Sequence, residues 1–120
     1  MLTDDFIIEQ SMMVIRFLKT ALISPGGGFI EEVEDIPFQS PQLEIKKELE
    51  SLIKQKEYCQ AEDLLYEQLE QEESDDNLCL GLWFYNCLLG EDEETMEEHN
   101  FGKDEILAGL KELESKKIDF

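Results

Sequence analysis

The chain has 120 residues, of which 42% are hydrophobic and 33% are charged. This length suits one domain, and the apolar fraction is too high for a disordered chain. Thirty acidic residues against ten basic residues give a formal net charge of -20, which repels nucleic-acid phosphates and anionic lipid headgroups. The composition therefore predicts a single folded domain over residues 1–120 and argues against nucleic acid and membranes as partners.

The cysteines and the first apolar stretch indicate the compartment. Three cysteines lie at irregular spacing: Cys59, Cys79 and Cys87. An odd, irregular set is not the pattern of a disulfide-stapled secreted domain. The apolar stretch 6–23 contains Glu9, Arg16 and Lys19, so it fits neither a signal peptide nor a membrane span. We expect a cytoplasmic protein.

Residues 4–23 predict an N-terminal helix, because their polar and apolar residues fall on opposite sides of a 3.6-residue wheel. The apolar side is wide and includes Ile7, Val14, Ile15, Phe17, Leu18, Ala21 and Leu22. One neighbouring helix does not normally cover an arc of that width, so we expect this helix to pack across a helical hairpin later in the chain or against a second subunit, as a homodimer. Residues 24–40, with Gly26 to Gly28 and several acidic residues, predict a loop.

Residues 41–116 predict a repeat-like helical region. Ser40 is expected to cap its first helix, with Pro41 at the first helical position. Apolar residues then recur at helical spacing, pause at residues 56–58, and resume as far as Leu69. This pattern predicts an antiparallel helical hairpin.

The next helix is expected to start after Ser74 and to stop at Gly90. It is apolar almost all round, which predicts a central position. The acidic connector, residues 91–98, is expected to contain at most one or two helical turns around Met96.

The last helix is predicted over residues 103–116. Phe101 and Ile106 flank its start at the spacing of a hydrophobic staple. No segment alternates with period two for long enough to indicate a strand. The predicted fold class is therefore all-α, with about five helices.

Part of the helical region resembles a tetratricopeptide repeat. The matching residues are Tyr58-Cys59-Gln60-Ala61 with Leu65, and then Leu80-Gly81 followed by Phe84. The two units lie about 32 residues apart, close to the repeat's 34-residue period. The resemblance implies a tetratricopeptide-like antiparallel hairpin, with the N-terminal helix added to it.

A second resemblance spans both ends of the chain. It is carried by Asp5-Phe6-Ile7, by His99-Asn100-Phe101, by Glu105-Ile106 and by Gly109-Leu110. In these features the chain is similar to a family of small uncharacterised bacterial proteins. The resemblance implies a helical domain with a repeat-like hairpin, and it implies no activity.

Catalytic, cofactor and metal sites are not predicted. The residue three before His99 is Met96 and not an acid, so the Glu-x-x-His metal pair is absent. No Cys-x-x-Cys pair occurs, and the glycines at 26–28 lack the spacing of a phosphate-binding fingerprint. A single histidine with no group to orient it does not make a nucleophilic site. We expect a protein that is not an enzyme.

Four residues are candidate partner contacts: Trp83, Tyr85, Phe17 and Leu18. Three consecutive aromatics, Trp83 to Tyr85, span about 200° of a helix, so we expect two of them in the core and one at a contact surface. The leading hypothesis is a non-catalytic protein-protein interaction module with a protein partner. The alternative is a small-molecule or cation-binding regulatory protein that uses the aromatic helix or the acidic connector.

Overall fold

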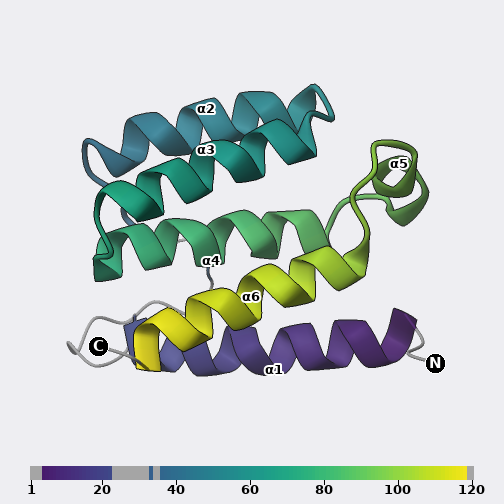
Figure 1. The fold of residues 1–120 in the computed structure, drawn as a ribbon, viewed down its shortest axis with the longest axis horizontal. Helices are drawn as coiled ribbons and strands as arrows, with labels where there is room; N and C mark the ends of the chain where they lie inside the picture. Colours follow the sequence, from purple (N-terminus) through teal and green to yellow (C-terminus); the bar gives the residue numbers. More distant parts are fainter. Residues whose placement is uncertain (1–3, 23–32, 34–35, 119–120) are drawn as a thin grey trace.

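The computed structural model describes residues 4–22, residue 33 and residues 36–118. Across these residues the chain forms six helices and no strand (Figure 1). Their bounds are α1 Asp4–Leu22, α2 Gln42–Lys54, α3 Tyr58–Gln71, α4 Asp75–Leu89, α5 Glu93–Glu98 and α6 Lys103–Ile118. The all-α prediction is confirmed, and α5 is the short helix expected in the acidic connector.

The helices are arranged around α4. Figure 1 shows α2 and α3 as an antiparallel pair along one edge, α4 in the middle, and α6 with α1 along the other edge. Helices α1, α2, α3 and α6 all pack against α4, and α1 also packs against α6. The antiparallel hairpin is confirmed, whereas its likeness to a tetratricopeptide repeat stays a prediction.

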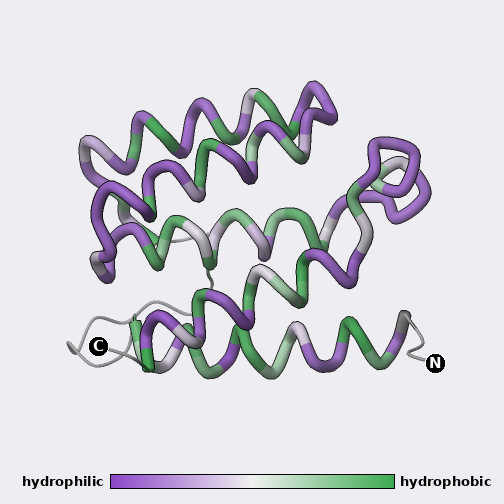
Figure 2. The backbone as a smooth tube through the Cα atoms, viewed as in Figure 1, coloured by the Kyte–Doolittle hydropathy of each residue, from purple (hydrophilic) through white to green (hydrophobic). Residues whose placement is uncertain are grey.

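Helix α4 supplies the centre of the core. Figure 2 shows hydrophobic residues along much of α4, while hydrophilic residues predominate on α3 and α5. Trp83, Phe84 and Tyr85 are all buried. We expected two of the three in the core; all three are buried, and a partner contact by one of them stays a prediction. Because other helices pack around α4, consecutive side chains that point in different directions all meet neighbours.

Helix α1 places most of its apolar arc in the core. Ile7, Val14, Ile15 and Leu18 are buried, since α6 and α4 both pack against this helix. The expectation that α1 lacks neighbours to cover its arc is corrected for these residues. Leu18 is a core residue and not a contact surface, but Phe17 remains 41% exposed.

Asn77 joins three helices at the start of α4. The predicted cap is confirmed, because Asn77 N–H donates to Ser74 Oγ at 3.2 Å. The buried Asn77 side chain donates to the carbonyl oxygen of Glu72 at 2.7 Å and accepts a bond from Gln42 Nε2 at 3.0 Å. The Asn77 side chain thereby satisfies the Glu72 carbonyl group, just beyond the end of α3, and links the end of α3 to the start of α2.

The predicted start of the hairpin needs a correction. Helix α2 begins at Gln42, Pro41 occupies the N-cap position, and no side chain caps the helix. A backbone oxygen replaces the expected hydroxyl, because Leu43 N–H donates to the carbonyl oxygen of Gln39 at 3.0 Å. In the preceding segment Val33 is buried, whereas the predicted Gly26 to Gly28 loop lies outside the described residues.

The segment between α5 and α6 follows the predicted pattern. Met96 is buried in α5, and Phe101 and Ile106, the two expected staple residues, are both buried. Asn100 has a φ of 61°, a left-handed conformation in which asparagine is favoured over most residues. This turn reverses the chain so that α6 can return along α4.

Candidate functional site

Two adjoining cavities lie along α4. The first, about 420 Å³, is lined by Lys46, Glu50, Ile53, Lys54, Trp83, Asn86, Cys87, Gly90 and Glu91. The second, also about 420 Å³, is lined by Ile8, Met12, Ile15, Arg16, Lys19, Val33, Asn86, Leu89 and Gly90. Because they share Asn86 and Gly90, we treat them as one feature and call it the α4 groove.

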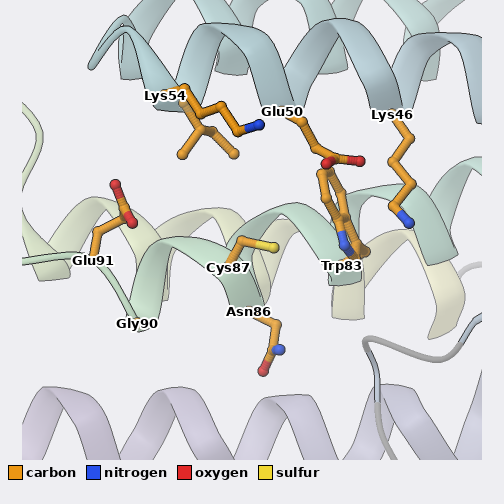
Figure 3. A pocket seen from close by; sticks show the side chains of 9 residues that line it. Lys46, Glu50, Lys54, Trp83, Asn86, Cys87, Gly90 and Glu91 are labelled. Carbon is orange, nitrogen blue, oxygen red and sulfur yellow. The ribbon is translucent and has the colours of Figure 1, made fainter.

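The fold explains why the groove exists. Trp83, Asn86 and Gly90 are spaced by three and four residues, so they lie on one side of α4. Helix α2 pairs with α3 and helix α1 pairs with α6, which leaves this side of α4 between α2 and α1. Figure 3 shows α2 side chains reaching toward Trp83, with Asn86 pointing the other way, toward α1.

Basic side chains are concentrated in the α4 groove. Two come from α2 and two from α1: Lys46, Lys54, Arg16 and Lys19. These are four of the ten basic residues of the chain, whereas two acidic residues, Glu50 and Glu91, line the groove among the residues that the structure describes. Within the described part of the chain, basic side chains therefore outnumber acidic ones at the groove.

One of the two acidic groups is already engaged. The Glu91 carboxylate accepts a hydrogen bond from Tyr58 O–H at 2.9 Å, and Lys56 Nζ lies 3.3 Å from the same oxygen. Burial, and then the adjacent Glu91, raise the pKa of Tyr58 to about 12, so the phenol stays a donor. These contacts reduce the ability of Glu91 to neutralise the groove lysines.

Lys46 lies against an aromatic wall of the groove. Its Nζ is 5.3 Å from the ring centroid of Trp83 and 5.7 Å from that of Phe38, both within the range of cation–π attraction. Figure 3 shows the Lys46 side chain beside the Trp83 ring. The Lys46 ammonium therefore lies at the groove, and its N–H groups can donate hydrogen bonds to a bound anion.

Negative charge is concentrated on other helices. Helix α3 carries Glu62, Asp63, Glu67 and Glu70, and helix α5 carries Glu93, Glu94, Glu97 and Glu98. Neither helix contains a basic residue. Helix α2, by contrast, has three acidic and three basic residues. Among the described residues, the groove thus differs from α3 and α5, whose charged residues are all acidic.

A second polar cluster joins α3, α4 and α6. Tyr85 O–H donates to Glu62 Oε2 at 2.6 Å, and the Tyr66 hydroxyl oxygen lies 3.4 Å from the Tyr85 hydroxyl oxygen. Burial raises the pKa of Glu62 above its ordinary value. The hydrogen bond from Tyr85 acts in the opposite direction, whereas the negative charges of Glu105 and Asp63 raise this pKa further. The cluster satisfies a buried tyrosine hydroxyl, and we interpret it as structural.

Replacing Glu62 by Gln is expected to reduce the pH dependence of stability. Because the folded pKa of Glu62 is raised, its contribution to stability is present at low pH and is lost as pH rises from about 4.5 through the folded value. The wild type should therefore gain free energy of unfolding, relative to Glu62→Gln, as pH falls from 7 to 4. Urea unfolding across this range measures the difference.

The control is Glu67→Gln, which removes an exposed carboxylate from the same helix. It should show a smaller pH-dependent difference from the wild type. If the wild type instead lost stability relative to Glu62→Gln on acidification, the native state would favour the ionised carboxylate, and the assigned direction of the pKa shift would be wrong.

The three cysteines differ in burial, and Cys59 Sγ lies 3.8 Å from the carbonyl oxygen of Asn100, the residue after the histidine. All three cysteines are free, and burial raises the pKa of Cys79 to about 11. Burial and nearby acids also raise the pKa of Cys59, so both thiols are weak nucleophiles at neutral pH. His99 is exposed, and its Nδ1 lies 2.8 Å from the carbonyl oxygen of Thr95. In the described part of the chain, no three His, Cys, Asp or Glu residues are placed to hold a metal ion.

The four candidate contact residues do not form one surface. Trp83 lines the α4 groove, Tyr85 is buried in the Glu62 cluster, and Leu18 is in the core. Phe17 alone is exposed, on the outer side of α1. No sequence motif marks the basic residues of the groove. Their one local signal is the density of lysines between residues 46 and 56.

Comparison with known proteins gives a family. A family model described as a family of unknown function, DUF6483, matches residues 1–117. The chain belongs to the DUF6483 family. This confirms the resemblance to an uncharacterised family. No curated protein and no solved structure matched the chain.

The family description assigns no activity, so the functional argument depends on the groove. In the described residues, no helix has both the length and the apolar character needed to cross a bilayer.

Proposed function

We propose that this protein is a non-catalytic protein-interaction module whose α4 groove binds a short acidic segment of a partner protein. The observation that carries the proposal is the set of four basic side chains along the α4 groove of an acidic chain, two of which, Lys46 and Lys54, line the same cavity as Trp83. Clusters of basic side chains are a recurring means of recognising acidic peptide motifs.

The net charge supports a short segment over a long polyanion. A nucleic acid or a membrane surface extends well beyond the groove, where it meets the field of acidic helices such as α3 and α5. Electrostatic interactions are largely screened beyond about 8 Å at physiological ionic strength. A segment confined to the groove therefore experiences mainly the local positive groups.

The groove also offers apolar contacts. Ile53 and Trp83 line one cavity, and Ile15 and Leu89 line the other. An extended peptide can place acidic side chains near Lys46 and Lys54 while burying apolar side chains between them. Two connected cavities suit such a chain better than a single compact ligand.

A second candidate function is supported by the contact between Lys46 and Trp83. An aromatic ring beside an ammonium is suited to a small molecule that has both a ring and a negative charge. We therefore retain a small-molecule-binding regulator as the alternative. A cation site in the acidic connector has no comparable support among the described residues.

The experiment selects 12-residue peptides from a random library on the immobilised full chain at physiological salt. We expect enrichment of Asp and Glu combined with aromatic or aliphatic residues. Affinities of a selected peptide are then measured by calorimetry for the wild type, Lys46→Glu and Lys54→Glu. Each groove variant should bind at least about tenfold more weakly, because it places like charges together.

The matched control is Lys47→Glu, which makes the same charge change at the next residue of α2. Lys47 is exposed and does not line the groove, so its affinity should stay within about threefold of wild type, the effect of a screened surface charge. Selection of basic or neutral peptides, or equal losses for Lys46→Glu and Lys47→Glu, would contradict the proposal. An anionic small molecule that copurifies with the wild type and is lost from Lys46→Glu would favour the alternative.

A further inference from the structure

A second surface, on the outer side of α1, is independent of the proposed function. Phe6, Met13 and Phe17 are 43%, 56% and 41% exposed, and their spacing of seven and four residues places them in one stripe. Gln10 continues the stripe, with its Nε2 4.0 Å from Met13 Sδ. These four residues are called the α1 stripe.

The α1 stripe is symmetric along the helix. Phe6 and Phe17 are equally distant from the midpoint between Ser11 and Met12, and so are Gln10 and Met13. A two-fold interface needs a surface that complements itself, with residue i on residue j and j on i. An antiparallel pair of α1 helices satisfies this condition by placing Phe6 on Phe17 of the second copy.

The charges beside the stripe favour the same arrangement. Asp5, Glu9 and Arg16 are exposed and lie on one flank of the stripe, given a rotation of about 100° per residue. In an antiparallel two-fold pair, each flank of the stripe faces the same flank of the other copy, and the residues of the two flanks run in opposite directions along the helix axis. Arg16 then lies level with position 7 of the second copy, about 3 Å along the axis from both Asp5 and Glu9.

A parallel pair would bring this charged flank against the opposite flank of the stripe, where Ala21 lies, and would leave Arg16 without an acidic partner. The location of α1 also limits repulsion between two copies of net charge -20. Its three acidic residues are nearly balanced by two basic ones, and Figure 1 places it at the edge opposite α2 and α3.

We propose that two copies of this chain associate through α1, antiparallel, about a two-fold axis near Ser11 and Met12. Phe6 packs against Phe17 of the second copy, and Arg16 pairs with Asp5 and Glu9 of the second copy. Arg16 is also at the rim of the α4 groove, and in this dimer the groove keeps Lys19, Lys46 and Lys54 as its basic groups.

Sedimentation equilibrium of the full chain tests the association. At concentrations up to about 100 µM, where a modest interface persists, the wild type should show twice the monomer mass of 14.0 kDa. Met13→Glu and Phe17→Glu should each be monomeric with an unchanged helical circular dichroism spectrum. Gln60→Glu, which adds the same charge at an exposed position of α3, should remain dimeric.

A charge exchange tests the orientation. Glu9→Arg and Arg16→Glu should each weaken the dimer at least about tenfold, because each puts like charges together. The double variant should bind more tightly than either single variant, because it restores one pair of opposite charges, although Asp5 then lies near a second acidic group. A monomeric wild type at about 100 µM would overturn the proposal. A double variant no tighter than the single variants would overturn the antiparallel arrangement.

Discussion

Gly109→Ala is expected to destabilise the fold by about 3 kcal/mol, through overpacking and loss of buried hydrogen bonds. A Cβ at this position would overlap the ring and the hydroxyl of Tyr85. The ring has little room to move, because Tyr85 is buried on α4 and its hydroxyl donates to Glu62. The gain in helix propensity, about 1 kcal/mol, is smaller than this cost.

Two other glycines provide a graded comparison. At Gly81 a Cβ would lie 2.8 Å from Leu113 Cδ2, the end of a flexible side chain, so Gly81→Ala should cost about 1 kcal/mol. At Gly90 the nearest contact is an ordinary 3.5 Å and φ is -87°, so Gly90→Ala should be nearly neutral. Urea unfolding ranks the three variants. Equal stability of Gly109→Ala and Gly90→Ala would show that Tyr85 does not pack against Gly109.

Phe101→Ala and Ile106→Ala should each cost about 2 to 5 kcal/mol, the usual effect of emptying a buried apolar site. Both side chains are buried, and the Phe101 ring also lies 6.2 Å from the Tyr58 ring. In a hydrophobic staple the two residues share one contact. The double variant should therefore lose less stability than the sum of the single variants.

A double-mutant cycle by urea unfolding measures this coupling. Ile118→Ala is the control, because Ile118 is 67% exposed in the last turn of α6, and it should change stability by less than about 0.5 kcal/mol. Additive costs for Phe101→Ala and Ile106→Ala would show that the staple contact is not formed.

The helices were predictable because their signals are local. The breaks at residues 56–58 and at Gly90 and the Ser74 cap all act within a few residues of the element that they limit. The α2 start differed because the backbone carbonyl of Gln39 accepts the Leu43 N–H bond that the Ser40 hydroxyl was expected to accept. Several acceptors compete at a helix start, and sequence alone does not rank them.

The packing around Tyr85 was not predictable. Periodicity showed that α4 is apolar nearly all round but not that its neighbours cover all three aromatics, since coverage depends on how the helices are arranged. In the sequence, Gly109 was one of the residues that carry the resemblance to a family. Its physical role, which is to leave room for the Tyr85 ring where α6 packs against α4, is visible only in the fold. Asn77 likewise gave no sign in the sequence that it is buried at a junction of helices.

The α4 groove was hidden for two reasons. Its basic residues come from α1 and α2, which are far apart in the sequence and meet only through α4. The net charge of -20 also indicated an acidic surface, but net charge is a sum that carries no information about location. Trp83 was identified as a candidate contact from its aromatic character alone, and the structure adds Lys46 beside it.

The most direct test of the proposed function is to map where a selected acidic peptide binds, by amide chemical-shift changes in the full chain. The account predicts that the largest changes fall on the Trp83 indole, Asn86 and Gly90, with smaller changes on facing residues of α1 and α2. Because Trp83 is the single tryptophan of the chain, its indole signal is assigned without ambiguity. Changes concentrated on α3, α5 or the outer side of α1, with the Trp83 indole unmoved, would contradict the account.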